Sequence, residues 1–136
     1  MAHRGKSHAI KRPRIARPGT FLIPSLSSIV LSNGIKVYLV PGPQDALLKI
    51  EWFFKAGRSS ESSMMASRIT ASMLREGSQS TSGSAIDEQF DYHGSHMTTH
   101  SGMDYNRVSF VSLTHDFERL FNLLVEVVTQ PAFKET

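Results

Sequence analysis

The chain has 136 residues, of which 40% are hydrophobic and 20% charged, a composition typical of one globular domain or part of one. It contains no cysteine, which excludes disulfides, thiolate zinc sites and cysteine nucleophiles. The formal net charge of +3 is concentrated at one end, because residues 1–20 carry six basic groups and no acid. The rest of the chain has nine basic and twelve acidic residues, so we do not expect it to bind nucleic acid.

Residues 1–19 are predicted to be a basic flexible tail, and residues 20–136 a partial domain. The tail lacks the apolar core of a secretory signal peptide, and Pro13 and Pro18 would interrupt the helix of an organellar presequence. No apolar run reaches the ~18 residues that a membrane-spanning helix needs. We therefore expect a soluble chain without a signal peptide or integral membrane segment, whose compartment, periplasmic or cytoplasmic, stays open.

A β-hairpin is the first predicted structural element. Residues 29–31 and 35–40 are apolar and flank Asn33-Gly34, a pair typical of a tight type I′ turn. A third strand is expected over residues 47–56, because large apolar side chains alternate along it. One face of that strand carries Leu48, Ile50, Trp52 and Phe54.

Two helices and two strands are predicted to follow. The first helix is expected over residues 61–75, with Ser60 as its N-cap and an apolar stripe spaced by four residues. That stripe consists of Met65, Ile69 and Met73. Ser84 to Asp87 resembles a capping box that opens a short helix, which Gly94 ends. Strands over residues 95–101 and 105–113 come next.

A last helix is predicted from Thr114 to about Val128, where apolar residues follow the helical period closely. The resulting order, β-β-β-α-α-β-β-α, indicates an α+β fold in which helices cover one face of a mainly antiparallel sheet.

Several sequence pieces occur in an order known from one protein family. They are LSNGIKVYLV, a strand ending in KAGR, Met-Leu-x-Glu-Gly-Ser, a Tyr-x-Gly turn, a Thr/Ser-rich strand and QPAF. The series, which covers about residues 23–133, resembles the N-terminal part of the pitrilysin/insulinase zinc peptidases, the inverzincins. It is most similar to bacterial members. The resemblance implies a truncated half domain like those of insulinase and the mitochondrial processing peptidase.

The resemblance also implies that the zinc chemistry of the family is absent. In active members the first helix carries H-x-x-E-H, in which two His bind zinc and the Glu is the general base. Arg68, Ala71 and Ser72 occupy those three positions in this chain. A guanidinium cannot ligate zinc, an alanine cannot act as a base, and serine is a poor ligand. The family's third ligand, a Glu, is expected beyond Thr136. We therefore expect no enzyme, no metal and no cofactor, with zinc only in active relatives.

A candidate peptide-binding edge follows from the same resemblance. The strand over residues 95–101 is polar and corresponds to the family's substrate-side strand. An extended peptide can add to such a strand through main-chain hydrogen bonds. The candidate residues are Ser95, Met97, Thr98, Thr99 and Ser101.

The histidines offer an alternative metal site, which we disfavour. His93, His96 and His100 have the spacing H-x2-H-x3-H. On a strand, His96 and His100 would share a face but lie about 13 Å apart at ~3.3 Å per residue, too far for one zinc ion.

Three functional hypotheses remain. The favoured one is a non-catalytic peptidase-like domain that pairs with an active homologous subunit, or with missing domains of its own chain, and contributes structural or peptide-binding surface. The second is a zinc-dependent endopeptidase whose ligands the sequence does not reveal. The third is an incomplete gene product without independent function, which should leave apolar surface uncovered.

Overall fold

The computed structural model describes residues 15, 19, 22–42 and 46–133. The chain divides into two compact units, Met1–Pro43 and Gln44–Thr136. Apart from Ile15 and Gly19, the predicted basic tail lies outside the described residues, so its flexibility stays a prediction. None of the helices in the described ranges is long and apolar enough to cross a membrane.

The first unit contains the predicted hairpin. Strands β1 (Ser27–Val30) and β2 (Lys36–Leu39) pair antiparallel, with Ile29 opposite Val37. The predicted type I′ turn is wrong, because of the two central residues only Gly34 has a positive φ, of 85°. Hydrogen bonds from Gly34 N to Leu31 O and from Leu31 N to Ile35 O instead close a three-residue loop, in which glycine takes the left-handed position.

The second unit is built on a three-stranded antiparallel sheet, ordered β3-β5-β4. It consists of β3 (Leu47–Phe54), β4 (His96–Ser101) and the central β5 (Asn106–Leu113). Val108 of β5 lies opposite Trp52 of β3 on one side and Thr99 of β4 on the other. β4 is therefore an edge strand of this sheet.

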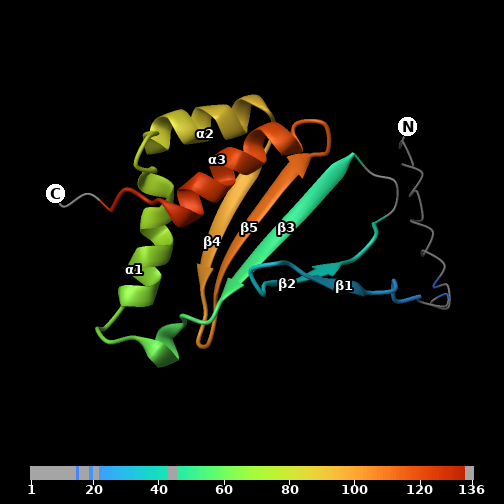
Figure 1. Cartoon of the computed structure of the whole chain (residues 1–136), viewed down its shortest axis with the longest axis horizontal. Helices are drawn as coiled ribbons and strands as arrows, with labels where there is room; N and C mark the ends of the chain where they lie inside the picture. Colours follow the sequence, from blue (N-terminus) through green and yellow to red (C-terminus); the bar gives the residue numbers. More distant parts are fainter. Residues whose placement is uncertain (1–14, 16–18, 20–21, 43–45, 134–136) are drawn as a thin grey trace, which may run out of the picture. The chain divides into compact units, whose positions relative to one another are not determined.

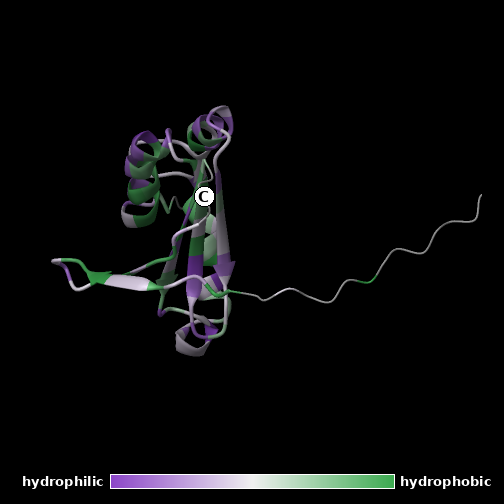
Figure 2. Cartoon of the chain, turned by 90° about the vertical axis from the view of Figure 1, so that its right-hand side faces the viewer, coloured by the Kyte–Doolittle hydropathy of each residue, from purple (hydrophilic) through white to green (hydrophobic). Residues whose placement is uncertain are grey.

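The helices α1 (Ala66–Met73), α2 (Gly83–Tyr92) and α3 (Phe117–Thr129) lie on one face of this sheet (Figures 1 and 2). Short 3₁₀ turns, η1 (Arg58–Ser60) and η2 (Leu74–Glu76), flank α1. The core between the two layers contains Ile86, Phe90, Met97, Val108, Phe110, Leu120, Leu124 and Val127. The ring centroids of Phe90 and Phe110 are 5.2 Å apart, and Trp52 packs against this core at its side. The α+β class with helices on one face is confirmed.

The three helices start at residues other than those predicted, and in α1 and α2 a side chain caps the helix at an unexpected position. α1 begins at Ala66 rather than Glu61, and the Glu61 carboxylate accepts hydrogen bonds from the N–H of Met65 (3.0 Å) and of Ser67 (3.1 Å). Glu61 therefore caps the helix from the preceding loop. In α2 the N-cap is Ser82, whose hydroxyl accepts from Ala85 N. α3 begins at Phe117, three residues after Thr114.

Candidate functional site

The entry to α1 is fixed against the turn between β4 and β5. The N–H of Gly57 donates to Asp104 O at 3.2 Å, and a Cβ on this glycine would lie 2.3 Å from Met103 O. Only glycine permits this close approach of two backbones. The backbone N–H of Ser59 donates to Met103 O. The KAGR segment of the sequence thus holds the β3-to-α1 connection on the β4–β5 turn.

The body of α1 lies against β4 through small side chains. Ser67 and Ala71 are its buried residues. Ser67 Oγ lies 2.8 Å from Ser101 Oγ and donates to Asn106 Oδ1 at 2.9 Å. These contacts join α1 to the adjacent ends of β4 and β5. The predicted apolar stripe lies on another side of the helix, where Met65 is 47% and Ile69 50% exposed.

The three residues that the resemblance aligns with the zinc motif of active relatives lie on adjoining sides of α1. Arg68 and Ser72 are exposed, and the Ser72 hydroxyl donates to Arg68 O at 2.8 Å. Ala71, 6% exposed, points into the packed side of the helix. One guanidinium, one methyl group and one hydroxyl do not form a zinc-binding donor set. Within the ranges that the structure describes, no group of three His, Cys, Asp or Glu residues is placed to hold a metal ion.

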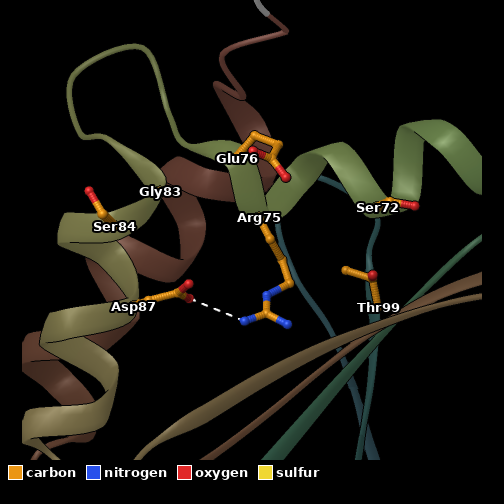
Figure 3. Close-up of a pocket in the computed structure, with 7 residues that line it drawn as sticks. All are labelled: Ser72, Arg75, Glu76, Gly83, Ser84, Asp87 and Thr99. Carbon is orange, nitrogen blue, oxygen red and sulfur yellow. Dashed lines mark hydrogen bonds and ion pairs between the residues drawn. The ribbon is translucent and has the colours of Figure 1, made fainter.

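A polar pocket lies beside these positions (Figure 3). Its volume is about 760 Å³, and Ser72, Arg75, Glu76, Gly83, Ser84, Asp87 and Thr99 line it. Arg75 in η2 extends toward Asp87 of α2, with 3.3 Å between Nη2 and Oδ1. Both side chains are about half exposed, at 46% and 49%, so solvent screens this ion pair and its contribution to stability is small.

The Arg75–Asp87 pair was missed by sequence reasoning, which considered Asp87 only as part of a capping box. The two residues lie on different elements, 12 positions apart. No periodicity links positions on two elements whose relative orientation is set by packing. The pair becomes visible only once α2 is placed beside the end of α1.

The candidate edge residues divide between the two faces of β4. Ser95, just before the strand, and Met97 are buried, each 4% exposed. The Ser95 hydroxyl donates to Ser112 Oγ at 3.0 Å. Thr99 and Ser101 are half-buried on the helix side, whereas Thr98 is exposed on the other face. The side chains thus form no single recognition surface, and what they share is the backbone of an edge strand.

Solved structures with a similar fold exist for this architecture, although the sequence comparisons found no match. No protein-family model matches the sequence, and no curated protein matches it. A solved structure from Pseudomonas fluorescens, described as a peptidase M16 inactive domain, superimposes with a TM-score of 0.75 at 25% identity. A protease from Helicobacter pylori superimposes with a TM-score of 0.72 at 17% identity, a likeness of fold alone.

The chain has the fold of a peptidase M16 domain. The matched region covers 81% of this chain and 27% of the Pseudomonas chain, and 83% and 28% in the Helicobacter comparison. The chain thus spans about a quarter of the length of these neighbours. The resemblance to bacterial pitrilysin/insulinase-type peptidases is confirmed at the level of the fold.

Of the four histidines that the structure describes, two contact one carboxylate and the other two lie apart from them on β4. His93 at the end of α2 places Nδ1 3.0 Å from Asp116 Oδ1, and His115 places Nε2 2.9 Å from Asp116 Oδ2. The His93–Asp116 contact joins the end of α2 to the start of α3. His96 and His100 are exposed on β4. They pair across the ladder with Val111 and Arg107 rather than with His93.

Proposed function

We propose that this chain is a non-catalytic peptidase-like domain that pairs with an active homologue, or with further domains of the same family. In that assembly it contributes a wall to which an extended peptide binds. The observation that carries the proposal is the edge strand β4, packed beside α1. The family resemblance implies that Arg68, Ala71 and Ser72 of this helix take the positions of the zinc ligands and base in active relatives. Such a domain retains a peptide-binding element without the means to cleave the peptide.

The outer surface of α1 supports the pairing. Met64 is 91% exposed, and Met65 and Ile69 are each about half exposed. Met64 and Met65 directly precede α1, and Ile69 lies within it. These three residues, called the α1 outer stripe, expose apolar side chains, whereas Ser67 and Ala71 form the packed side of the helix. Methionine is common at adaptable protein–protein contacts. Clustered exposed apolar side chains of this kind often mark an interface.

Peptide binding by strand addition can be tested with a backbone-modified control. A fluorescent Thr/Val-rich peptide should bind the chain, as measured by anisotropy, because an edge strand supplies main-chain donors and acceptors to any extended segment. The matched control is the same peptide with alternate amides N-methylated, which removes those donors and keeps the side chains. Equal binding of both peptides, or binding of neither, contradicts the peptide-binding part of the proposal.

Pairing is tested separately by mixing the chain with an intact H-x-x-E-H homologue and measuring the mass of the complex in solution. The Ile69→Asp variant should reduce complex formation, because a charge in an apolar contact is costly when the contact excludes water. The matched control is Asn122→Asp on the exposed side of α3. Complex formation that is insensitive to Ile69→Asp excludes the α1 outer stripe as the contact.

A further inference from the structure

The free backbone groups of β4 can be assigned from the pairing on both sides of β5. Gly102 N donates to Tyr105 O at 2.9 Å where β4 turns into β5, and Thr114 N donates to Ala46 O at 2.7 Å at the β3 end. Because antiparallel neighbours alternate between hydrogen-bonded and non-hydrogen-bonded pairs, odd-numbered residues of β5 hydrogen-bond to β4 and even-numbered ones to β3.

This alternation leaves half of the β4 backbone unpaired within the sheet. His96, Thr98 and His100 face Val111, Ser109 and Arg107, so their N–H and C=O groups point to β5. The residues whose backbone groups point away from β5 are Met97, Thr99 and Ser101. Among the described residues, no backbone hydrogen bond outside the sheet uses the N–H of any of these three. Thr99 is the middle one, and its side chain lines the polar pocket.

The position of Thr99 determines where a side chain of an added strand would lie. Directly opposite residues of paired strands carry their side chains on the same face. A ligand residue opposite Thr99 would therefore direct its side chain to the helix side, where Arg75 and Asp87 line the pocket. The pair presents guanidinium donors next to a carboxylate acceptor.

We infer that, if the proposed peptide binding holds, the bound segment pairs with the backbone of Thr99 and places an amide side chain, Asn or Gln, against Arg75 and Asp87. A carboxamide carries one carbonyl acceptor and one NH₂ donor, which match the guanidinium and the carboxylate. An acidic or basic side chain would meet one like charge in this pocket. A large apolar side chain would displace water from the ion pair, and it has no polar group to replace the hydrogen bonds that the water made.

The register is tested by proline substitution in β4. Thr99→Pro removes an N–H that points to the free edge, a position at which edge strands tolerate proline. It should therefore leave the chain folded by circular dichroism and weaken binding of the Thr/Val-rich peptide by about fivefold, since one hydrogen bond is lost. Thr98→Pro removes an N–H that donates to β5, and it should destabilise the fold. The reverse pattern, with Thr98→Pro tolerated and Thr99→Pro unfolded, overturns the assignment.

The amide preference is tested with four versions of one Thr/Val-rich host peptide, carrying Gln, Leu, Glu or Lys at a central position. Gln should bind at least about fivefold more tightly than Leu, the value of one net hydrogen bond. Arg75→Ala should abolish this preference, whereas the control Arg119→Ala, an exposed arginine on α3, should keep it. Binding of all four peptides with no Gln preference, or a preference unchanged by Arg75→Ala, overturns the inference and leaves the proposed function intact. If none of the peptides binds, the proposed function itself fails.

Discussion

The helices α1 and α3 lie on the same sheet and use their apolar residues in opposite ways. α3 buries Leu120, Leu124 and Val127 completely. α1 buries Ser67 and Ala71, while Met65 and Ile69 stay half exposed. An apolar stripe at helical spacing therefore marks the core in α3 and an uncovered surface in α1.

The difference arises from what each helix packs against. α3 lies over the large core side chains, which leucine and valine fill. α1 lies beside β4, where the Ser67 hydroxyl reaches Ser101 and Asn106 at hydrogen-bond distance. Such a close approach admits small or hydrogen-bonding side chains only. The narrow space between α1 and β4 therefore determines which side of the helix faces the sheet, and the hydrophobicity of its side chains does not.

The comparison predicts unequal costs for truncating the two stripes. Leu124→Ala should lower the free energy of unfolding by about 2–5 kcal/mol, because it opens a cavity in a fully buried site. Ile69→Ala, at a half-exposed site, should change it by about 0.5 kcal/mol or less. Urea unfolding followed by circular dichroism measures both. Similar losses for the two variants would show that the α1 outer stripe is buried in solution.

A smaller effect is expected at the start of α1. Glu61→Ala removes the carboxylate that accepts from Met65 N and Ser67 N, so the free energy of unfolding should fall by about 0.5–2 kcal/mol, as for other lost helix caps. Amide hydrogen exchange at Ser67 should accelerate. The control is Glu88→Ala on the exposed side of α2. Equal exchange rates at Ser67 in both variants would rule out the cap.

A pH-dependent contribution is expected where the loop after α1 meets α3. Hydrogen bonds from Ser78 (2.5 Å) and from Ser80 to the Glu126 carboxylate lower the pKa of Glu126 below its ordinary value of 4.5. A lowered pKa stabilises the fold above the ordinary value, and this stabilisation is lost as pH falls through the folded-state pKa.

The stability difference between the native chain and Glu126→Gln should therefore shrink as pH is lowered from 6 through about 4.5 and below. Thermal unfolding at several pH values measures it, with Glu118→Gln on the exposed side of α3 as control. A difference that grows on acidification would contradict the assigned direction.

The smallest expected effect is that of metal removal. Because Arg68, Ala71 and Ser72 offer no zinc-binding set, the purified chain should hold less than about one-tenth of an equivalent of zinc. A chelator should leave the urea midpoint unchanged. A lower midpoint after chelation, with stoichiometric zinc by atomic absorption, would revive the alternative of a zinc-dependent endopeptidase.

The sequence predicted much of the fold, because each element carries its own local signal. The alternation in β3 and the apolar period of α3 indicated these elements, and their order was confirmed. The type of the hairpin turn and the start of α1 were wrong. In both places the outcome depends on hydrogen bonds that compete with the local preference, such as those accepted by Glu61.

The candidate site was predicted less completely. From the sequence and its family resemblance, Arg68, Ala71 and Ser72 were assigned to the zinc positions and strand β4 to a peptide-binding edge. β4 is an edge strand, whereas its peptide binding and the zinc-position assignment stay predictions. It did not reveal the Arg75–Asp87 pair. Neither the buried state of Met97 nor the outward position of Ile69 followed from the pattern.

What the sequence determined by itself is the order of the elements, the resemblance to the M16-type fold and the donor chemistry at each position, because these depend on residue type and short-range spacing. Only the tertiary structure decided which side of α1 faces the sheet, which backbone groups of β4 stay free and which residues line the pocket. Those features depend on the relative placement of α1, α2 and β4, which long-range packing sets.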